Sequence, residues 1–340
     1  MGTDGKHDSD AISFKLDGAT ELNQFGGEMA YQGLETLPVI GEAAIRDALT
    51  WTPLIDSIEN AMIAFSAGEV AQPVRQMVPV PGHDAIIAAM PAVGEAMAVK
   101  IVTLYHANAG TDIPTHQAVI LIFDKANGSP LAVLDGRLIT EMRTAAGSAA
   151  AARKLAAKDS RIVTIMGNGV QARAHAQALA EVRSCDELRL WARNEQNGRL
   201  RAEEIGAVFH ANAEDAVRDA DIIACTTSSA EPILEGAWLK PGAFVTSVGW
   251  NTSEGRELDD AAMANIVLVE SAEAARDQAG DIRGSNCEIF AEIGDVFAGS
   301  TIVPEGETII YDSIGIAIMD VAAAQLAYNL ITQESAKGKV

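Results

Sequence analysis

Two glycines and an alanine stand at the spacing Gly-x-Gly-x-x-Ala, at Gly167, Gly169 and Ala172. An apolar run at 161–166 precedes them, and a helical pattern follows from residue 171. Gly167 permits a tight turn, Gly169 lets a ligand approach the backbone, and Ala172 allows close packing of helix on strand. The helix N-terminus offers free N–H groups and a partial positive charge to an anion. This arrangement predicts a site for the pyrophosphate of a dinucleotide. The alternative is an ordinary strand–helix turn that uses glycine only for its geometry.

The residues after the next strand bear on the choice between the two nicotinamide cofactors. In NAD-binding units, an acid at this point holds the ribose hydroxyls. Here the strand at 187–191 leads into Arg193, and Glu195 comes too late to take that place. Arg193 is placed to meet a 2′-phosphate, and Asn194 and Asn197 can add hydrogen bonds. We therefore expect NADPH, with NADH possible. The alternative is that Arg193 is a solvated loop charge and that the cofactor is NAD.

Three cations are candidates for binding a carboxylate. Lys100 is the only charge in 97–104, and a buried ammonium needs a partner or a lowered pKa. A bound carboxylate would be such a partner, although an edge lysine reaching water is the alternative. Arg143 stands where the sequence changes from strands to alternating strands and helices, and its fork matches a carboxylate. A salt bridge to Glu141 or another acid is the alternative. Arg75, which opens a strand, is a second possible clamp.

Histidines offer weaker signals. His116 precedes a strand, where it can hydrogen-bond cofactor or substrate or be purely structural. His175 falls on the helix after the glycine turn, and we expect it to be structural. The six histidines show no metal-ligand spacing, so we predict no metal.

Composition narrows the class of protein. The chain has 340 residues, of which 48% are hydrophobic, enough for one or two cores. Its net charge is −22 and it has no basic run, so a nucleic acid would be repelled. Its three cysteines are widely spaced, which is typical of a reducing compartment. With no secretory signal and no apolar run of about eighteen residues, we expect a cytoplasmic protein that does not span a membrane.

The pattern of apolar residues changes near Thr140. Before it, a helical pattern at 40–68 is followed by consecutive short strands, which indicates an antiparallel or mixed sheet. After it, strands and helices alternate, which predicts a doubly wound parallel sheet. The expected strands before the change are 75–80, 84–90, 96–104, 117–123 and 131–135. After it, a helix at 143–158 leads into strands at 161–166, 187–192, near 208, 221–227, 243–249, 266–270 and 308–311, with helices at 171–183, 195–205, 213–219 and 315–331.

Several stretches together resemble the ornithine cyclodeaminase/mu-crystallin family, over roughly residues 40–330, and most closely its ketimine reductase branch. The stretches that carry the resemblance are Val99 to Thr103, Pro114 to Gln117, Leu131 to Gly136, Arg143 to Ala146, Gly167 to Ala172, Gly242 to Gly249 and Arg256 to Asp259.

The resemblance implies an α/β fold: a Rossmann-type doubly wound sheet at 141–312 and a discontinuous α+β domain at 38–140 plus 313–340. The second domain would bind substrate and form a homodimer, and 1–37 would be an N-terminal extension. The active site would lie between the domains, with the substrate carboxylate at Arg75, Lys100 and Arg143. The implied cofactor contacts are Thr144, Gly167, Asn168, Gly169, Val170, Gln171, Thr226, Thr227, Ser228 and Gly249, together with the region around Arg193.

One departure from the family pattern bears on the reaction. Cyclodeaminases carry an aspartate after the Val-Gly pair, whereas this chain has Asn251 two residues after Gly249. Asparagine is not a carboxylate base, but it can hydrogen-bond a substrate nitrogen. We therefore expect NADPH-dependent reduction of a cyclic ketimine, such as 1-piperideine-2-carboxylate or 1-pyrroline-2-carboxylate. The alternatives are an alanine-type or other amino acid dehydrogenase, an ornithine cyclodeaminase, and a protein that binds NADPH and a small acid without turnover.

Overall fold

Alternating apolar residues between Gln76 and Asp135 build the first sheet, as their pattern predicts. The computed structural model describes residues 37–249 and 255–337. The sheet has the order β1-β6-β5-β4-β3-β2, with β2 to β6 antiparallel in succession and β1 parallel to β6. Its strands are β1 (Val39–Ile40), β2 (Gln76–Pro79), β3 (Ala85–Val93), β4 (Met97–Tyr105), β5 (His116–Phe123) and β6 (Pro130–Asp135).

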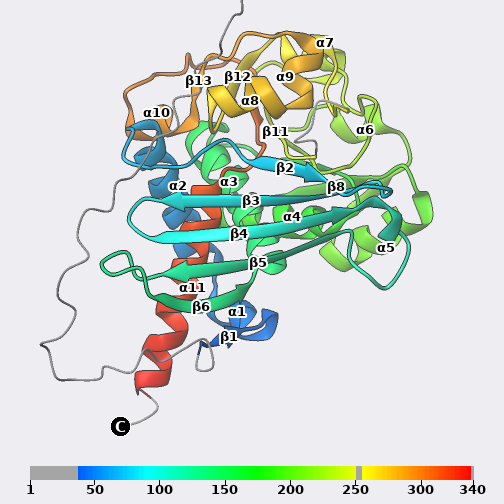
Figure 1. Cartoon of the computed structure of the whole chain (residues 1–340). Helices are drawn as coiled ribbons and strands as arrows, with labels where there is room; N and C mark the ends of the chain where they lie inside the picture. Colours follow the sequence, from blue (N-terminus) through cyan, green and yellow to red (C-terminus); the bar gives the residue numbers. More distant parts are fainter. Residues whose placement is uncertain (1–36, 250–254, 338–340) are drawn as a thin grey trace, which may run out of the picture. The chain divides into compact units, whose positions relative to one another are not determined.

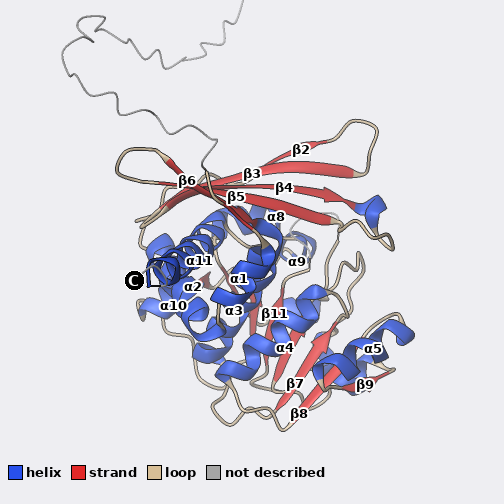
Figure 2. Cartoon of the chain, turned by 90° about the horizontal axis from the view of Figure 1, so that it is seen from below, coloured by secondary structure: helices blue, strands red, loops and turns tan. Residues whose placement is uncertain are grey.

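The register of this sheet gives it one buried and one exposed face. Met90, Lys100 and Ile120 stand opposite one another across three strands, and all three are buried. On the opposite face, Ile101 and Val119 pair across β4 and β5 and are 42% and 48% exposed. Helices α3 and α11 contact the buried face, and among the described residues no element covers the other face (Figure 2).

The second sheet is parallel throughout, which confirms the predicted doubly wound α/β fold. Its order is β13-β12-β14-β11-β10-β7-β8-β9. The late strand β14 lies between β11 and β12. The strands are β7 (Ile162–Met166), β8 (Glu187–Trp191), β9 (Val208–His210), β10 (Ile222–Cys225), β11 (Phe244–Ser247), β12 (Ile266–Val269), β13 (Ala291–Glu292) and β14 (Ile309–Asp312).

Helices fill the space between and around the two sheets (Figure 1). The long last helix passes behind β3, β4 and β5 and contacts all three strands (Figure 1). The helices are α1 (Glu42–Ala48), α2 (Trp51–Ser66), α3 (Gly136–Leu155), α4 (Val170–Val182), α5 (Glu195–Ile205), α6 (Ala213–Val217), α7 (Asp260–Met263), α8 (Ala272–Gln278), α9 (Gly280–Ser285), α10 (Ile293–Ala298) and α11 (Ala317–Lys337).

Helix α3 starts earlier than the sequence indicated. We expected a helix from Arg143, whereas α3 begins at Gly136, because the Asp135 side chain accepts a hydrogen bond from the N–H of Leu138. Arg143 therefore lies in the second turn of a buried helix. Gly147 lies further along it, where a Cβ atom would stand 2.8 Å from Cε of Met319, so this glycine allows close packing of α3 against α11.

Other helical predictions also need correction. The single helix expected over 40–68 is two helices, α1 and α2, separated at Leu49–Thr50. Between 260 and 298, helices α7 to α10 form where the sequence pattern assigned none. They are short, with few turns to show a helical period.

Residues from Leu37 onward form one compact unit, and the expected domain limits stay a prediction. No described helix is long and apolar enough to cross a membrane.

Candidate active site

A cavity of about 480 Å³ brings together residues of both sheets. Its lining includes the three predicted cations, Arg75, Lys100 and Arg143, and also His116. The same cavity reaches predicted cofactor contacts, namely Thr144, Gly169, Val170, Gln171, Thr226, Thr227, Ser228 and Gly249.

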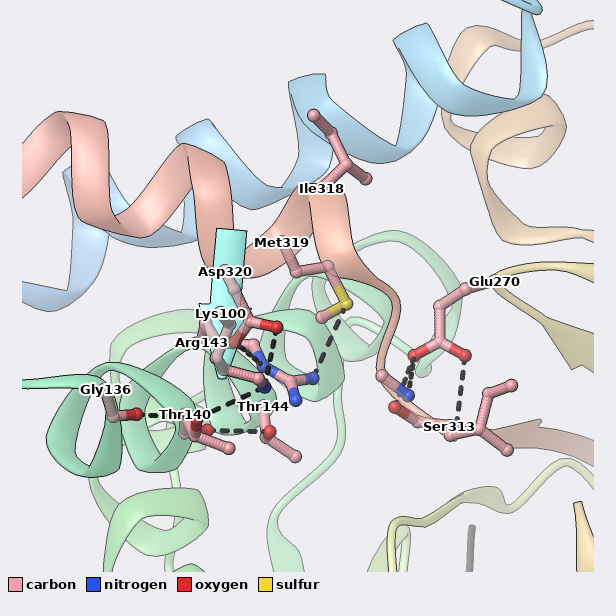
Figure 3. Close-up of polar contacts among 12 residues, drawn as sticks. Lys100, Gly136, Thr140, Arg143, Thr144, Glu270, Ser313, Ile318, Met319 and Asp320 are labelled. Atoms are coloured by element: carbon pink, nitrogen blue, oxygen red, sulfur yellow. Dashed lines mark hydrogen bonds and ion pairs between the residues drawn. The ribbon is translucent and has the colours of Figure 1, made fainter. Parts of the chain in front are cut away.

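Lys100 is fully buried on the inner face of β4, which excludes the solvent-facing alternative. We expected a bound carboxylate as its partner, but the chain itself supplies one, because Nζ lies 2.7 Å from Oδ2 of Asp320 on α11 (Figure 3). The Thr140 hydroxyl lies 3.4 Å from Nζ. Burial lowers the pKa of Lys100 to about 7, and the charge of Asp320 limits this fall.

Arg143 shares the same carboxylate. Its Nε donates to Oδ1 of Asp320 at 3.0 Å, and a second guanidinium nitrogen lies 3.8 Å from the Met319 sulfur (Figure 3). The alternative of a salt bridge to Glu141 or another acid is thus confirmed, but with Asp320 as the acid, since Glu141 pairs with Arg173 at 2.7 Å. Burial alone would raise the pKa of Asp320, but the charges of Arg143 and Lys100 lower it. Asp320 is therefore an ionised carboxylate between two cations.

Arg75 is held by backbone. One of its guanidinium nitrogens donates to the carbonyl oxygens of Ile314 and Gly315. Burial, followed by the charge of Arg143, lowers the pKa of Arg75 to about 10, so it remains a cation at neutral pH. Gly315 has φ +67°, and a Cβ atom there would overlap the Arg143 guanidinium. The 314–315 turn therefore fixes both arginines.

A buried carboxylate, Glu270, holds this turn. It accepts hydrogen bonds from the hydroxyls of Tyr311 and Ser313 and from the N–H groups of Ile314 and Gly315. Figure 3 shows Glu270 beside Ser313. Glu270 thus ties the end of β12 to the segment that contacts Arg75 and Arg143.

His116 lines the cavity beside these cations. Burial, with the charges of Lys100 and Arg143, lowers its pKa to about 4, so the ring is neutral at physiological pH. A neutral imidazole both donates and accepts hydrogen bonds without adding charge. His175, by contrast, is structural as expected, because its buried ring lies 2.9 Å from both Ser148 Oγ and the carbonyl oxygen of Gln171.

The glycine turn fits a dinucleotide. Gly167 has φ +124°, and a Cβ atom there would lie 2.7 Å from Oγ1 of Thr226. A Cβ atom at Gly169, which precedes α4, would meet nothing within 4 Å, so a phosphate has access to the helix N-terminus. A second cavity of about 220 Å³ begins here and is lined by Gly167, Asn168, Gly169, Trp191, Ala192, Arg193, Asn194, Thr226, Thr227, Ser228, Ser229 and Ile233.

The tip of β8 agrees with the sequence in having no acid at this cavity. Arg193 lines it and forms no ion pair with any described residue. Asn194 also lines it, but its side-chain oxygen accepts from the N–H of Asn197 and so caps α5. Asn197 lies outside the lining of both cavities, and its contact with a cofactor stays a prediction.

The sequence did not identify Asp320 or Glu270 as residues of the site. Nor did it identify Glu257, a buried carboxylate that contacts Thr227 and Gly249. Asp320 is the only charge in the apolar segment 314–333, the same signal that identified Lys100.

Asn251 lies outside the described residues. Within those residues, no three His, Cys, Asp or Glu side chains are arranged to hold a metal ion, and metal independence stays a prediction.

Comparison with known proteins shows the family to which the chain belongs. The family model described as "Ornithine cyclodeaminase/mu-crystallin family" matches residues 39–335. The chain belongs to this family. It is 41% identical to the ketimine reductase mu-crystallin of Mus musculus, over 81% of this chain and 91% of that protein. It is 31% identical to the Delta(1)-pyrroline-2-carboxylate reductase of Bacillus cereus, over 89% and 99%.

Solved structures of the family superpose closely. The Delta(1)-pyrroline-2-carboxylate reductase of Thermococcus litoralis, in complex with NADH and L-proline, has a TM-score of 0.83 and 30% identity, covering 88% of this chain and 98% of that one. An archaeal alanine dehydrogenase dimer with bound NAD has a TM-score of 0.82 and 25% identity, over 88% and 97%.

Proposed function

We propose that the protein is an NADPH-preferring reductase of cyclic ketimines that carry a carboxylate on the imine carbon. The observation that carries this proposal is the surplus of buried positive charge beside the glycine turn. Arg75, Lys100 and Arg143 all line the cavity, whereas Asp320, which pairs with Lys100 and Arg143, does not. Arg75 is held by backbone carbonyl oxygens and not by an acid. In a protein of net charge −22, such a surplus supports a site for an anionic ligand.

The rest of the cavity wall favours an uncharged ring. Ile86, Ala88 and Met90 of β3 and Val102 and Leu104 of β4 line it. Among the described lining residues the only carboxylate is Glu141, which Arg173 already neutralises. The side-chain ammonium of ornithine would have to share Glu141 with Arg173, through the one Glu141 oxygen that has no hydrogen-bond partner, whereas the methylene groups of a cyclic ketimine match the wall.

The chain's residues would position and protonate the substrate. Binding the carboxylate at Arg143 and Arg75 also fixes the adjacent imine carbon, which is positional catalysis. A reduced nicotinamide, when bound, supplies a hydride. For that carbon to accept it, the imine nitrogen must be protonated, and its C=N electron pair then returns to nitrogen as the amine lone pair. Lys100, whose pKa is about 7, is placed to give this proton and to recover one from water.

Cofactor preference rests on the tip of β8. Arg193 faces the cavity with no ion-pair partner among the described residues, and Trp191 and Asn194 stand beside it. A free guanidinium favours the 2′-phosphate of NADPH, and no acid stands there to hold the ribose of NADH.

The face of the first sheet that carries Ile101 and Val119, which no described element covers, supports a homodimer; we call it the bare face. Val78, Ile87, Ile101 and Val119 expose 41% to 58% of their surface on the strands β2 to β5. Apolar side chains gathered on an uncovered sheet face are typical of protein interfaces.

The three cysteines are free, which supports a cytoplasmic location.

The decisive experiment follows the oxidation of NADPH and NADH with 1-piperideine-2-carboxylate, 1-pyrroline-2-carboxylate, and pyruvate plus ammonia. We expect rapid NADPH oxidation with a cyclic imine. Turnover only with pyruvate and ammonia would instead identify an alanine-type dehydrogenase. Release of ammonia from ornithine would identify a cyclodeaminase, and NADPH binding without any turnover would indicate a binding protein.

A further inference from the structure

Glu257 joins the ends of two central strands of the parallel sheet. It is completely buried. One carboxylate oxygen accepts from the N–H and the hydroxyl of Thr227, each at 2.6 Å. The other accepts from the N–H of Gly249 at 2.8 Å and from the hydroxyl of Ser247 at 3.0 Å. Thr227 follows β10 and Ser247 ends β11, so one side chain fixes the distance between the two strand ends.

Both ends belong to the ligand cavities. Thr227 lines the substrate cavity and the cavity beside the glycine turn, and Gly249 lines the first. The two segments are packed so closely that a Cβ atom at Gly249 would overlap the Thr227 carbonyl oxygen and the Glu257 carboxyl group. Glu257 itself lines neither cavity, and the proposed reaction does not use it.

We propose that Glu257, as an ionised carboxylate, is a positioning residue that holds the ends of β10 and β11 at the spacing required to bind a reduced dinucleotide. This inference rests on the proposed function only in that it requires the cleft to bind a nicotinamide cofactor.

The surroundings of Glu257 explain how it keeps its charge. Asp281 accepts from the N–H groups of Glu257 and Leu258, at 2.9 and 2.8 Å. It also lies 3.0 Å from the Ser247 hydroxyl, whose single proton it shares with Glu257. Asp312, also buried, has one oxygen without a hydrogen-bond partner. Burial, followed by the charges of Asp281, Glu270 and Glu257, raises the pKa of Asp312 well above its ordinary value. Asp312 therefore holds a proton at neutral pH, so it adds no negative charge that would oppose the ionisation of Glu257.

Protonation of Glu257 would weaken its link to Gly249 or to Thr227. Burial raises its pKa to about 7, while the Thr227 and Gly249 donors oppose this rise. Asp281 also faces it. Burial raises the pKa of Asp281, while its hydrogen-bond donors and the Arg256 cation oppose this rise. The Thr227 and Ser247 hydroxyls can accept a hydrogen bond from a neutral carboxyl, but the N–H groups of Gly249 and Thr227 can only donate. A neutral carboxyl therefore weakens the contact with whichever of these two N–H groups faces its protonated oxygen.

The same chemistry makes Glu257→Gln informative. An amide of the same shape presents an NH₂ group on one side, which meets a donor either at Gly249 or at Thr227. Glu257→Asp keeps the charge with a shorter reach. Glu288→Gln makes the same chemical change at an exposed position and is the matched control.

The test measures the Kd of NADPH and NADH by nucleotide fluorescence, together with the KM for imine and the melting temperature of the cofactor-free protein. We expect Glu257→Gln to weaken both nucleotides by about tenfold or more, with the imine KM changed much less. Glu257→Asp should recover part of this loss, and Glu288→Gln should match the wild type. A folded Glu257→Gln protein with unchanged Kd values would overturn the inference, as would equal losses in imine and nucleotide binding.

The wild type provides an independent test if Glu257→Gln fails to fold. NADH has no 2′-phosphate to titrate, so its Kd should rise between about pH 8 and about pH 6 only if Glu257 must be ionised. A flat profile would count against the inference. Nucleotide binding needs no imine turnover, so a protein that binds NADH with this pH dependence but reduces no imine refutes the proposed reaction alone.

Discussion

The Lys100 ammonium lies 2.7 Å from the Asp320 carboxylate, which joins the middle of the first sheet to the last helix. The same carboxylate receives a hydrogen bond from Arg143. One anion thus holds two cations of different reach, a compact ammonium and a planar guanidinium, on one wall of the cavity. This shared carboxylate fixes their separation before any substrate binds, which lowers the entropy cost of the reactive geometry.

Asp320→Asn should move the pH profile of imine reduction. Asp320 raises the pKa of Lys100 against burial, so losing its charge lowers that pKa further below about 7. If protonated Lys100 is the active form, kcat/KM falls as pH rises through the pKa of Lys100. In the variant this fall in kcat/KM should therefore begin at a lower pH than in the wild type. We expect a loss of about tenfold or more near neutral pH and partial recovery in more acidic buffer. Asp47→Asn, on the exposed side of α1, is the control, and an unshifted profile would contradict this role.

Lys100→Ala and Arg143→Ala should each reduce kcat/KM by at least about 100-fold, about 2.7 kcal/mol of transition-state stabilisation. Lys100→Ala removes the proposed proton donor, and Arg143→Ala removes a cation that we assign to the substrate carboxylate. Each variant leaves Asp320 with one of its two ion-pair partners. Steady-state kinetics with a cyclic ketimine provide the measurement, with the exposed Lys158→Ala as control. Nearly normal turnover in both variants would rule out these assignments.

Arg193→Ala should reduce the preference for NADPH over NADH. The KM for NADPH should rise by about tenfold or more, because a charge-assisted contact with the 2′-phosphate is lost, while that for NADH should change little. Arg199→Ala is a matched control, since Arg199 on α5 pairs with Glu195 and lies over Phe209, outside both cavities. Equal changes for both cofactors would show that Arg193 does not read the 2′-phosphate.

Val119→Asp should dissociate the proposed dimer. Val119 is 48% exposed in the middle of β5, on the bare face of the sheet, and a carboxylate there would be buried without a partner in an apolar interface. The molar mass from light scattering should fall to that of one chain. Leu200→Asp, at a 62% exposed position on α5, should leave the mass unchanged. A dimer that survives Val119→Asp places its interface elsewhere.

The sequence supported most of the two sheets because their periodicities are local. Alternation marks β3, β4 and β5, and the glycine turn marks the join between β7 and α4. Lys100 was identifiable because a charge in an apolar strand demands a partner. The identity of that partner could not be predicted, because Asp320 lies near the far end of the sequence. Its surroundings there show only the pattern of a helix packed by apolar residues.

Carboxylates that hold loops were equally hard to foresee. Glu257 and Glu270 each accept several hydrogen bonds, half of them from backbone N–H groups, and such contacts leave no pattern in side-chain types. The early start of α3 has a local explanation in the Asp135 cap, but an aspartate ending a strand is also common in turns that lead to no helix.

The position of β14 has a consequence for the chain during its synthesis. Residues 309–312 occupy the space between β11 and β12, and the helix that follows carries Asp320 to Lys100. A nascent chain that has not yet released these residues from the ribosome lacks an inner strand of its parallel sheet and has two buried cations without their anion. Assembly of the Lys100, Arg143 and Asp320 cluster thus requires the last helix, so a chain that ends before Asp320 should lack it.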